Sequence, residues 1–276
     1  METRDDDVGP WSEQKLKLLQ KYLRAYVQIL SKQEWCKGYE YIDAFAGSGK
    51  PKSRDEQRYV DGSPRVALGL TPAFTRYHFI ELSDWRRKKL EALVAEFSNR
   101  EVRIYGGDCN EALQNRIVPQ LSESSFRRAI AFLDPFGMQL EWETLEAMAK
   151  VKTIEVLLNF PVMAINRNVR RRHPQSIPVS LVDAMNRFWG TEEWRAELFE
   201  SVPTLFGEET VRVKQSGIEL GERFRKRLKT VYPHTTSPLL MANSKNAPLY
   251  CLMFAGHKAT GARIVEQIFG RFLTLG

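Results

Sequence analysis

The chain has 276 residues, of which 43% are hydrophobic and 27% charged, and its 41 Lys and Arg outnumber its 34 Asp and Glu to give a net charge of +7. This composition is ordinary for a globular protein and excludes a largely disordered, fibrous or low-complexity chain. No apolar run approaches the roughly 20 residues of a membrane span, and the acidic start at residues 1–7 is unlike a signal peptide. We therefore expect a cytoplasmic protein without membrane contact. Its positive charge is compatible with nucleic acid but does not establish it.

The cysteines and histidines argue against disulfides and metals. Cys36, Cys109 and Cys251 are far apart and include no C-x-x-C spacing, so neither a disulfide framework nor a zinc knuckle is expected. The four histidines form no H-x-x-x-H pair of the kind that holds a metal ion. We expect no metal site.

The first predicted elements are a flexible tail over residues 1–11 and a helix over residues 12–32. Ser12 can cap this helix, in which Leu16, Leu19 and Leu23 recur at helical spacing. Short apolar runs then alternate with amphipathic stretches. The runs of strand length are Tyr39–Phe45, Tyr77–Ile80, Val102–Tyr105, Ala129–Leu133, Ile154–Phe160, Pro238–Ala242 and Leu249–Ala255. The helical stretches are Pro64–Leu70, Asp84–Phe97, Asn110–Leu121, Glu141–Lys150, Ile218–Tyr232 and Gly261–Leu273.

This alternation predicts an α/β fold with a mainly parallel sheet and helices on both faces. Two regions interrupt it: a polar segment over Lys50–Asp61, and a helical insertion over residues 166–217, in which Val179–Trp189 and Glu192–Phe199 have helical patterns. The sequence contains no internal repeat and no linker, so we expect a single domain over residues 1–276. In such sheets ligands bind at the carboxyl ends of the strands, and the residues there are the functional candidates.

The first strand leads into the pattern D-x-F-x-G-x-G, formed by Asp43, Phe45, Gly47 and Gly49. Glycines allow a tight turn and a close approach of the backbone to a ligand. Lys52 stands where the dinucleotide fingerprint has its third glycine, and the spacing of a Walker A loop is also missing. An acidic residue before the glycines repels phosphate and suits a ligand with a cationic amino-acid group. A plain strand-to-helix turn is the alternative.

The next two strands also end in carboxylates. Glu81 ends the second strand and can accept both hydroxyls of a ribose. Asp108 follows the third strand and can accept a hydrogen bond from an adenine amino group. Each alone can equally be a solvated loop residue, and only their register with Asp43 favours a common ligand.

The fourth strand ends in Asp134-Pro135-Phe136-Gly137. The Asp134 carboxylate and the Pro135 carbonyl form a pair of acceptors that can orient an exocyclic amine for attack on an electrophilic carbon. Phe136 offers a face on which a base can stack. The alternative is that Asp134 and Pro135 only cap the following helix. Asn159 ends the fifth strand and can either contact the substrate or make a turn.

Together, Asp43–Gly49, Glu81, Asp108 and Asp134–Gly137 resemble motifs one to four of class I S-adenosylmethionine-dependent methyltransferases. More narrowly, the segments Y-I-D-A-F-A-G-S-G, F-L-D-P-F-G and L-L-N-F-P-V-M-A-I-N-R resemble the three-Cys-motif partner protein (TcmP) family over roughly residues 12–273. The resemblance implies a Rossmann-like class I methyltransferase fold with a seven-stranded sheet, S-adenosyl-L-methionine as cofactor, and an iron–sulfur partner protein that carries three cysteines.

The resemblance leaves the acceptor open. D-P-F-G is similar to the tetrad of tRNA guanine N2-methyltransferases, whereas most adenine and cytosine N-methyltransferases have D/N-P-P-Y/F, from which Phe136 and Gly137 depart. Arg167, Arg170 and Arg171, followed by Arg172 and His173, open the insertion beside the expected site. Such a run is usually a solvated helix face, and contact with phosphate is the rival interpretation.

The first hypothesis is a methyltransferase that acts on an exocyclic amine of a nucleobase. Its cofactor would be bound by Asp43, Phe45, Gly47, Gly49, Glu81 and Asp108, its acceptor amine positioned by Asp134, Pro135 and Phe136, and the remaining substrate contacted by Asn159, Arg167, Arg170 and Arg171. The second hypothesis is a non-catalytic or accessory partner of the three-Cys iron–sulfur protein. A small-molecule methyltransferase is the third.

Overall fold

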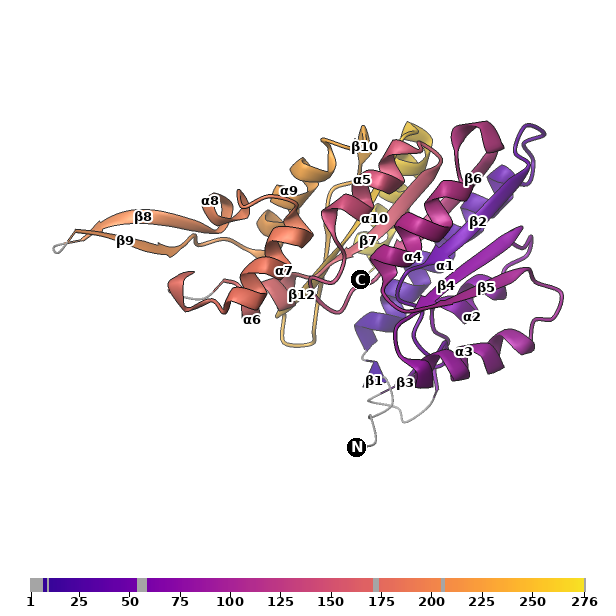
Figure 1. Cartoon of the computed structure of the whole chain (residues 1–276), viewed down its shortest axis with the longest axis horizontal. Coiled ribbons are helices and arrows are strands. Elements are labelled where there is room, and N and C mark those ends of the chain that lie inside the picture. Colours follow the sequence, from indigo (N-terminus) through magenta and orange to yellow (C-terminus); the bar gives the residue numbers. More distant parts are fainter. Residues whose placement is uncertain (1–6, 9, 54–58, 171–173, 205–206, 276) are drawn as a thin grey trace.

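The computed structural model describes residues 7–8, 10–53, 59–170, 174–204 and 207–275. Within these ranges its centre is a sheet of eight strands, in the order β10-β12-β7-β6-β2-β4-β5 with β11 paired to β12 (Figure 1). The strands are β2 (Gly38–Asp43), β4 (Arg76–Glu81), β5 (Val102–Gly106), β6 (Arg127–Leu133), β7 (Ile154–Phe160), β10 (His234–Thr235), β11 (Leu239–Ala242) and β12 (Pro248–Gly256).

The middle of the sheet is parallel. β2 pairs in parallel with β4 on one side and β6 on the other, β5 and β7 extend these pairs, and β12 joins β7 in the antiparallel sense. Cys251 of β12 pairs with Phe160 of β7 and with Leu240 of β11, while Ala255 pairs with β7 and β10. β10 and β11 therefore share the far edge of β12, and the sheet is seven positions wide. The predicted mainly parallel α/β sheet is confirmed.

Helices cover both faces because successive strand side chains point to opposite sides. On one face Ile42 and Ala131 pack beneath α4 (Cys109–Ala112), α5 (Trp142–Lys150) and α9 (Gly217–Leu228). On the other, Tyr41 and Phe132 pack beneath α1 (Pro10–Leu30), α2 (Ser63–Leu68), α3 (Asp84–Ala95) and α10 (Ala259–Leu275). In the part of the chain that the structure describes, no helix is long and apolar enough to cross a membrane.

Three predicted segments differ from the structure: the start of the first helix, the tail with the polar segment over Lys50–Asp61, and the helix over Asn110–Leu121. α1 begins at Pro10, so Ser12 lies inside the helix and is not its cap. β1 (Asp7–Val8) pairs in parallel with β3 (Lys52–Ser53), and this pairing joins part of the predicted tail to the polar segment. Residues 1–6, 9 and 54–58 lie outside the described residues.

After α4 the chain continues as a π turn (Leu113–Ile117) and a 3₁₀ turn (Val118–Gln120), where Pro119 has no N–H to extend a regular helix.

The insertion after β7 contains less helix than predicted. α6 (Val162–Asn168), α7 (Val179–Trp189) and α8 (Trp194–Leu198) are followed by an antiparallel hairpin of β8 (Phe199–Thr204) and β9 (Gly207–Arg212). This hairpin extends away from the body of the protein (Figure 1). The predicted helix over Glu192–Phe199 is wrong at its end, because Phe199 already belongs to β8 and the β-branched residues that follow favour an extended strand.

The glycine segment after β2 supplies a test of the fold. Gly49 has φ of 74°, and a Cβ at this position would lie 2.3 Å from Leu93 Cδ2. We expect Gly49→Ala to lower the free energy of unfolding by about 1–3 kcal/mol, because it adds backbone strain to a clash. Gly270→Ala, in α10 where nothing lies within 4 Å of the added Cβ, is the control and is expected to be neutral or stabilising. Equal urea midpoints for the two variants would contradict this account.

Candidate functional site

The candidate site lies at the carboxyl edge, which we define as the ends of β2, β4, β5 and β6. After β2 the chain moves outward to β4 and β5 and then returns to place β6 on the opposite side of β2. The order of strands reverses at this point, and loops that leave in opposite directions open a crevice there. The candidates Asp43, Glu81, Asp108 and Asp134 all stand at this edge or directly after it.

Glu81 holds the glycine segment in place. Its Oε2 accepts a hydrogen bond from the Gly47 backbone N–H at 2.9 Å, and its Oε1 accepts one from the Ser83 N–H at 2.7 Å, at the start of α3. Gly47 has φ of 63°, a conformation that side-chain-bearing residues rarely adopt. The buried carboxylate thus connects the loop after β2 to the loop after β4, and keeps lone pairs for a further donor.

A first cavity, of about 190 Å³, opens beside Glu81. Phe45, Glu81, Asp108 and Phe136 all contribute to its wall, so the structure brings four predicted residues together around one space. Asp108 caps α4, since its Oδ1 accepts the Asn110 N–H at 2.8 Å and the Glu111 N–H at 3.2 Å. The exposed Asp108 side chain therefore has a structural role and an oxygen to offer to a ligand.

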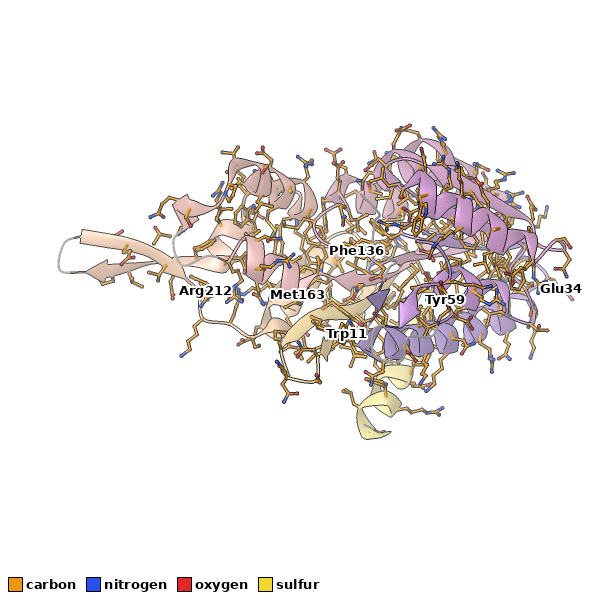
Figure 2. The ribbon with its side chains drawn as sticks, turned by 90° about the horizontal axis from the view of Figure 1, so that it is seen from below. Trp11, Glu34, Tyr59, Phe136, Met163 and Arg212 are labelled. Atoms are coloured by element: carbon orange, nitrogen blue, oxygen red, sulfur yellow. The ribbon has the colours of Figure 1, made fainter. Side chains whose placement is uncertain are left out.

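A second cavity, of about 430 Å³, adjoins the first. The two share Asp108, Phe136 and Gln139, and the second extends beneath α6 and α7 to Arg187. Phe136 is 73% exposed, which is unusual for a large aromatic side chain. Figure 2 shows it between the body of the sheet and the part of the chain after β7 that carries Met163 and Arg212. Phe136 thus stands at the boundary of two adjoining cavities, with the Arg86 guanidinium 5.9 Å from the centre of its ring, and its exposed ring can stack with a planar group.

Asp43 lies beneath these cavities and lines neither. Its side chain is fully buried, with Oδ2 accepting the Tyr41 hydroxyl at 3.0 Å and Oδ1 accepting the Phe45 N–H at 3.3 Å. Burial raises the pKa of Asp43 from 3.8 to about 7, against the opposing effect of its hydrogen bonds to Ser63, Tyr41 and Phe45. Asp43 therefore shapes the loop from below. Gly49 likewise supports the turn, since its carbonyl accepts the Gly62 N–H at 2.9 Å.

Asp134 lies on the face of the sheet that α1 covers. Its Oδ2 is paired with the Lys15 ammonium, and its Oδ1 accepts a hydrogen bond from Asn159 Nδ2 at 2.5 Å. The structure therefore brings Asp134 and Asn159 together, as the ends of neighbouring strands require. Neither of the two cavities is lined by the Asp134 side chain. The Asn159 Oδ1 atom is buried and has no hydrogen-bond partner among the described residues.

Lys15 is the residue that the sequence analysis missed. It is buried, and its ammonium lies 5.1 Å from the centre of the Tyr250 ring and 6.0 Å from that of Phe132. Tyr250 in turn donates from its hydroxyl to the Trp11 carbonyl at 3.0 Å. The signal was present in the sequence, because Lys15 precedes Leu19 by four residues and so falls within the apolar stripe of α1.

The basic run divides into different environments. Arg167 is exposed on α6. Arg170 is buried at 6% exposure and donates to the carbonyls of Val213 at 2.8 Å and Gln215 at 3.3 Å, so it ties the end of α6 to the chain after β9. Burial, followed by Arg212 and Arg223, lowers the pKa of Arg170. Arg171, with Arg172 and His173, lies outside the described residues.

Comparisons with known proteins bear on the fold. No family model matches the chain, and no curated protein matches its sequence. The chain is similar to the crystal structure of protein LPL1258 from Legionella pneumophila, described under DUF519. The sequence identity is 12%, the similarity covers 93% of this chain and 90% of that chain, and the TM-score is 0.56. This similarity shows a shared fold.

Two further similar structures carry methyltransferase names or ligands. One is the N-terminal domain of EvdMO1, crystallised with SAH and D-fucose, at 10% identity, 86% and 82% coverage and a TM-score of 0.39. The other is a SAM-dependent methyltransferase of the DUF858 family from Leishmania major, at 8% identity, 88% and 73% coverage and a TM-score of 0.39.

The raised pKa of Asp43 predicts how its substitution changes stability with pH. Between pH 4 and 7 the folded chain keeps a proton on Asp43 that the unfolded chain has released. The free energy of unfolding therefore falls as pH rises through this range, and above pH 7 the whole destabilisation by the buried carboxylate remains. Asp43→Asn removes the titration. We expect the stability of the variant relative to the original chain to rise from pH 5 to pH 8 by up to about 3 kcal/mol.

Urea unfolding at the two pH values measures this difference. Asp183→Asn, a change of the same kind at an exposed position of α7, is the control and should shift stability equally at both values. A pH-independent effect of Asp43→Asn would contradict the prediction.

Proposed function

We propose that the protein is an S-adenosylmethionine-dependent methyltransferase whose acceptor is an exocyclic amine of a nucleobase. The observation that carries the proposal is the first cavity, in which Glu81, Asp108 and Phe136 surround one space at the carboxyl edge. Glu81 keeps acceptor capacity for ribose hydroxyls, and Asp108 for an adenine amino group. The cavity also contains Arg86, whose Nε lies 3.9 Å from Glu81 Oε1, so its two carboxylates face one cation. An acidic balance without a phosphate-binding loop suits a cationic nucleoside better than a nucleotide.

The cofactor would supply an electrophilic methyl group on a sulfonium. The acceptor then needs a binding place that adjoins the cofactor, and the second cavity meets this need because it shares Phe136 and Asp108 with the first. A base stacked on Phe136 would have its edge near the Pro135 carbonyl, which can orient the amine. As the nitrogen takes the methyl group, its proton becomes acidic and passes to an acceptor or to water.

Asp134 is the candidate for the group that accepts this proton. Lys15 competes with the substrate amine for its carboxylate. In the structure a nitrogen donor, Lys15 Nζ, already occupies Oδ2. A substrate amine that uses Asp134 has to displace this ammonium and draw the side chain out from under α1. Asn159 supports the carboxylate through Oδ1 whether or not Lys15 remains in place.

Cofactor binding is tested first. We expect S-adenosylmethionine to bind with a Kd well below about 1 mM in isothermal titration. Asp108→Asn should weaken it by about tenfold, because the amide replaces one acceptor oxygen while Asn still caps α4. Asp183→Asn again serves as the matched control and should leave the Kd unchanged. Absent binding, or an Asp108→Asn variant that binds as tightly as the original chain, would contradict the assignment of the first cavity.

Methyl transfer is tested by mass spectrometry of nucleosides from cells with and without the gene, and by transfer from labelled cofactor in vitro. We expect one methylated nucleoside to disappear with the gene. Asp134→Asn should reduce transfer by at least about tenfold while cofactor binding persists, whereas Lys15→Met, which removes the competing ammonium, should retain activity. If both variants lost activity equally, the pair would act only by holding α1, and Asp134 would not bind the amine.

A second candidate function rests on the β8–β9 hairpin. This arm extends away from the body (Figure 1), and its strands carry Glu200, Glu208 and Glu209 against a single Arg212. An acidic arm repels phosphate, so it favours a protein partner over nucleic acid. This observation supports the accessory role beside a three-Cys iron–sulfur protein. That role predicts a complex that survives purification together with an unchanged set of nucleosides. An altered small metabolite instead would indicate a small-molecule methyltransferase.

A further inference from the structure

A third cavity, of about 520 Å³, lies at the amino edge of the sheet, the opposite edge from the candidate site. α1, the loop before β2, the starts of β6 and β7, and the start of α10 enclose it. Its lining is Tyr22, Tyr26, Ile29, Leu30, Gln33, Trp35, Arg128, Lys152, Thr153, Glu155, His257, Lys258, Thr260, Gly261 and Ile264. The volume is within the range of small-molecule sites, and none of the residues discussed for methyl transfer contributes to it.

Glu155 is the acidic group of this cavity. Its Oε2 accepts a hydrogen bond from the Tyr22 hydroxyl at 2.7 Å, while Oε1 has no hydrogen-bond donor among the described residues. α10 approaches this carboxyl closely, since a Cβ on Gly261 would lie 2.9 Å from Oε1. Burial raises the pKa of Glu155 to about 7. A ligand that donates N–H groups to Oε1 would compensate for the burial of this carboxylate.

Tyr26 adds a second polar atom without a partner. Its side chain is only 7% exposed, its hydroxyl forms no hydrogen bond among the described residues, and it lines the same cavity. Buried hydroxyls normally have a partner, so this orphan atom points to a ligand group that is not part of the chain. Trp35 provides a planar wall, with the Arg128 guanidinium 4.7 Å from the centre of its ring.

The rim of the cavity is cationic. Arg128, Lys152 and Lys258 contribute fixed positive charges, and Lys258 stands directly before α10, whose first residues also line the cavity. Lys152 has φ of 58°, a costly conformation for a residue with a side chain. Burial lowers the pKa of His257, against the opposing effect of the hydrogen bond between its Nε2 and the Ala149 carbonyl at 2.8 Å. These cationic side chains favour an anionic ligand group at the rim.

We propose that this amino-edge cavity binds a guanine mononucleotide. The base edge would donate to Glu155 Oε1 and contact the Tyr26 hydroxyl, with the ring against Trp35, and the phosphate would lie farther out on the rim, at the exposed Lys258 ammonium. Guanine is the nucleobase that presents two adjacent N–H donors, on N1 and N2, to one carboxylate. Adenine pairs an N–H donor with an acceptor that an ionised carboxylate repels. This proposal does not depend on methyltransferase activity, because the two edges share no lining residue.

Isothermal titration of the full chain with GMP at pH 8, where Glu155 is mostly ionised, tests the site. We expect saturable binding, with AMP weaker by about tenfold. Glu155→Gln should weaken GMP by about tenfold and abolish the preference over AMP. The neutral amide fits this buried position, since the carboxyl already titrates near neutrality. Lys258→Ala should weaken GMP and AMP alike, and Lys245→Ala, an exposed lysine in the turn before β12, should change neither.

Two results would overturn the proposal. One is absence of saturable GMP binding to the original chain. The other is GMP binding that survives Glu155→Gln and Lys258→Ala but weakens in Asp108→Asn, which would place the nucleotide at the carboxyl edge instead. Failure of S-adenosylmethionine binding would leave the GMP result unaffected, so the two proposals fail separately.

Discussion

Both neighbours of β2 run parallel to it, and the positions of the candidate residues at the strand ends follow from this arrangement. Parallel neighbours bring their carboxyl ends to one edge, and the reversal of strand order at β2 keeps the outgoing loops apart. Glu81 can therefore bond across to the Gly47 N–H, although the two residues are 34 positions apart in sequence. The same arrangement gathers the amino ends at the opposite edge, where Glu155 and Lys152 lie near the start of β7. One sheet thus presents cavities of different chemistry at its two edges, an acidic one beside Glu81 and Asp108 and one with a cationic rim beside Lys152 and Lys258.

The sequence predicted the sheet well because its central strands are buried on both faces and stand out as short apolar runs. β7 was predicted to the residue, and β2, β6 and β12 differ from prediction by at most two residues at an end. The β8–β9 hairpin was missed because Phe199 continues an apparently helical pattern, and only the β-branched residues beyond it favour strands. Local patterns define elements when burial dominates, and they fail where an exposed arm is stabilised mainly by its own pairing.

The candidate site was predictable where a residue's role follows from its strand end. Phe45, Glu81, Asp108 and Phe136 meet at one cavity for that reason. Two features depend on tertiary contacts that no spacing encodes. Lys15 reaches Asp134 from a helix that lies more than a hundred residues away in sequence, and Arg170, one of a run of basic residues, turns inward to backbone carbonyls. A charged residue within the apolar stripe of a helix, as at Lys15, therefore indicates a buried ion pair.

The acidic arm has a consequence for self-association. A two-stranded hairpin that extends into solvent leaves an unpaired row of backbone N–H and C=O groups along each outer edge, which is a template for adding further strands. Pro203 removes one such donor from β8, and Glu200 and Glu208 place like charges where a second copy would have to approach. These residues act as edge protection, so contact with another molecule would involve the side-chain faces of the arm, and identical copies would repel one another there.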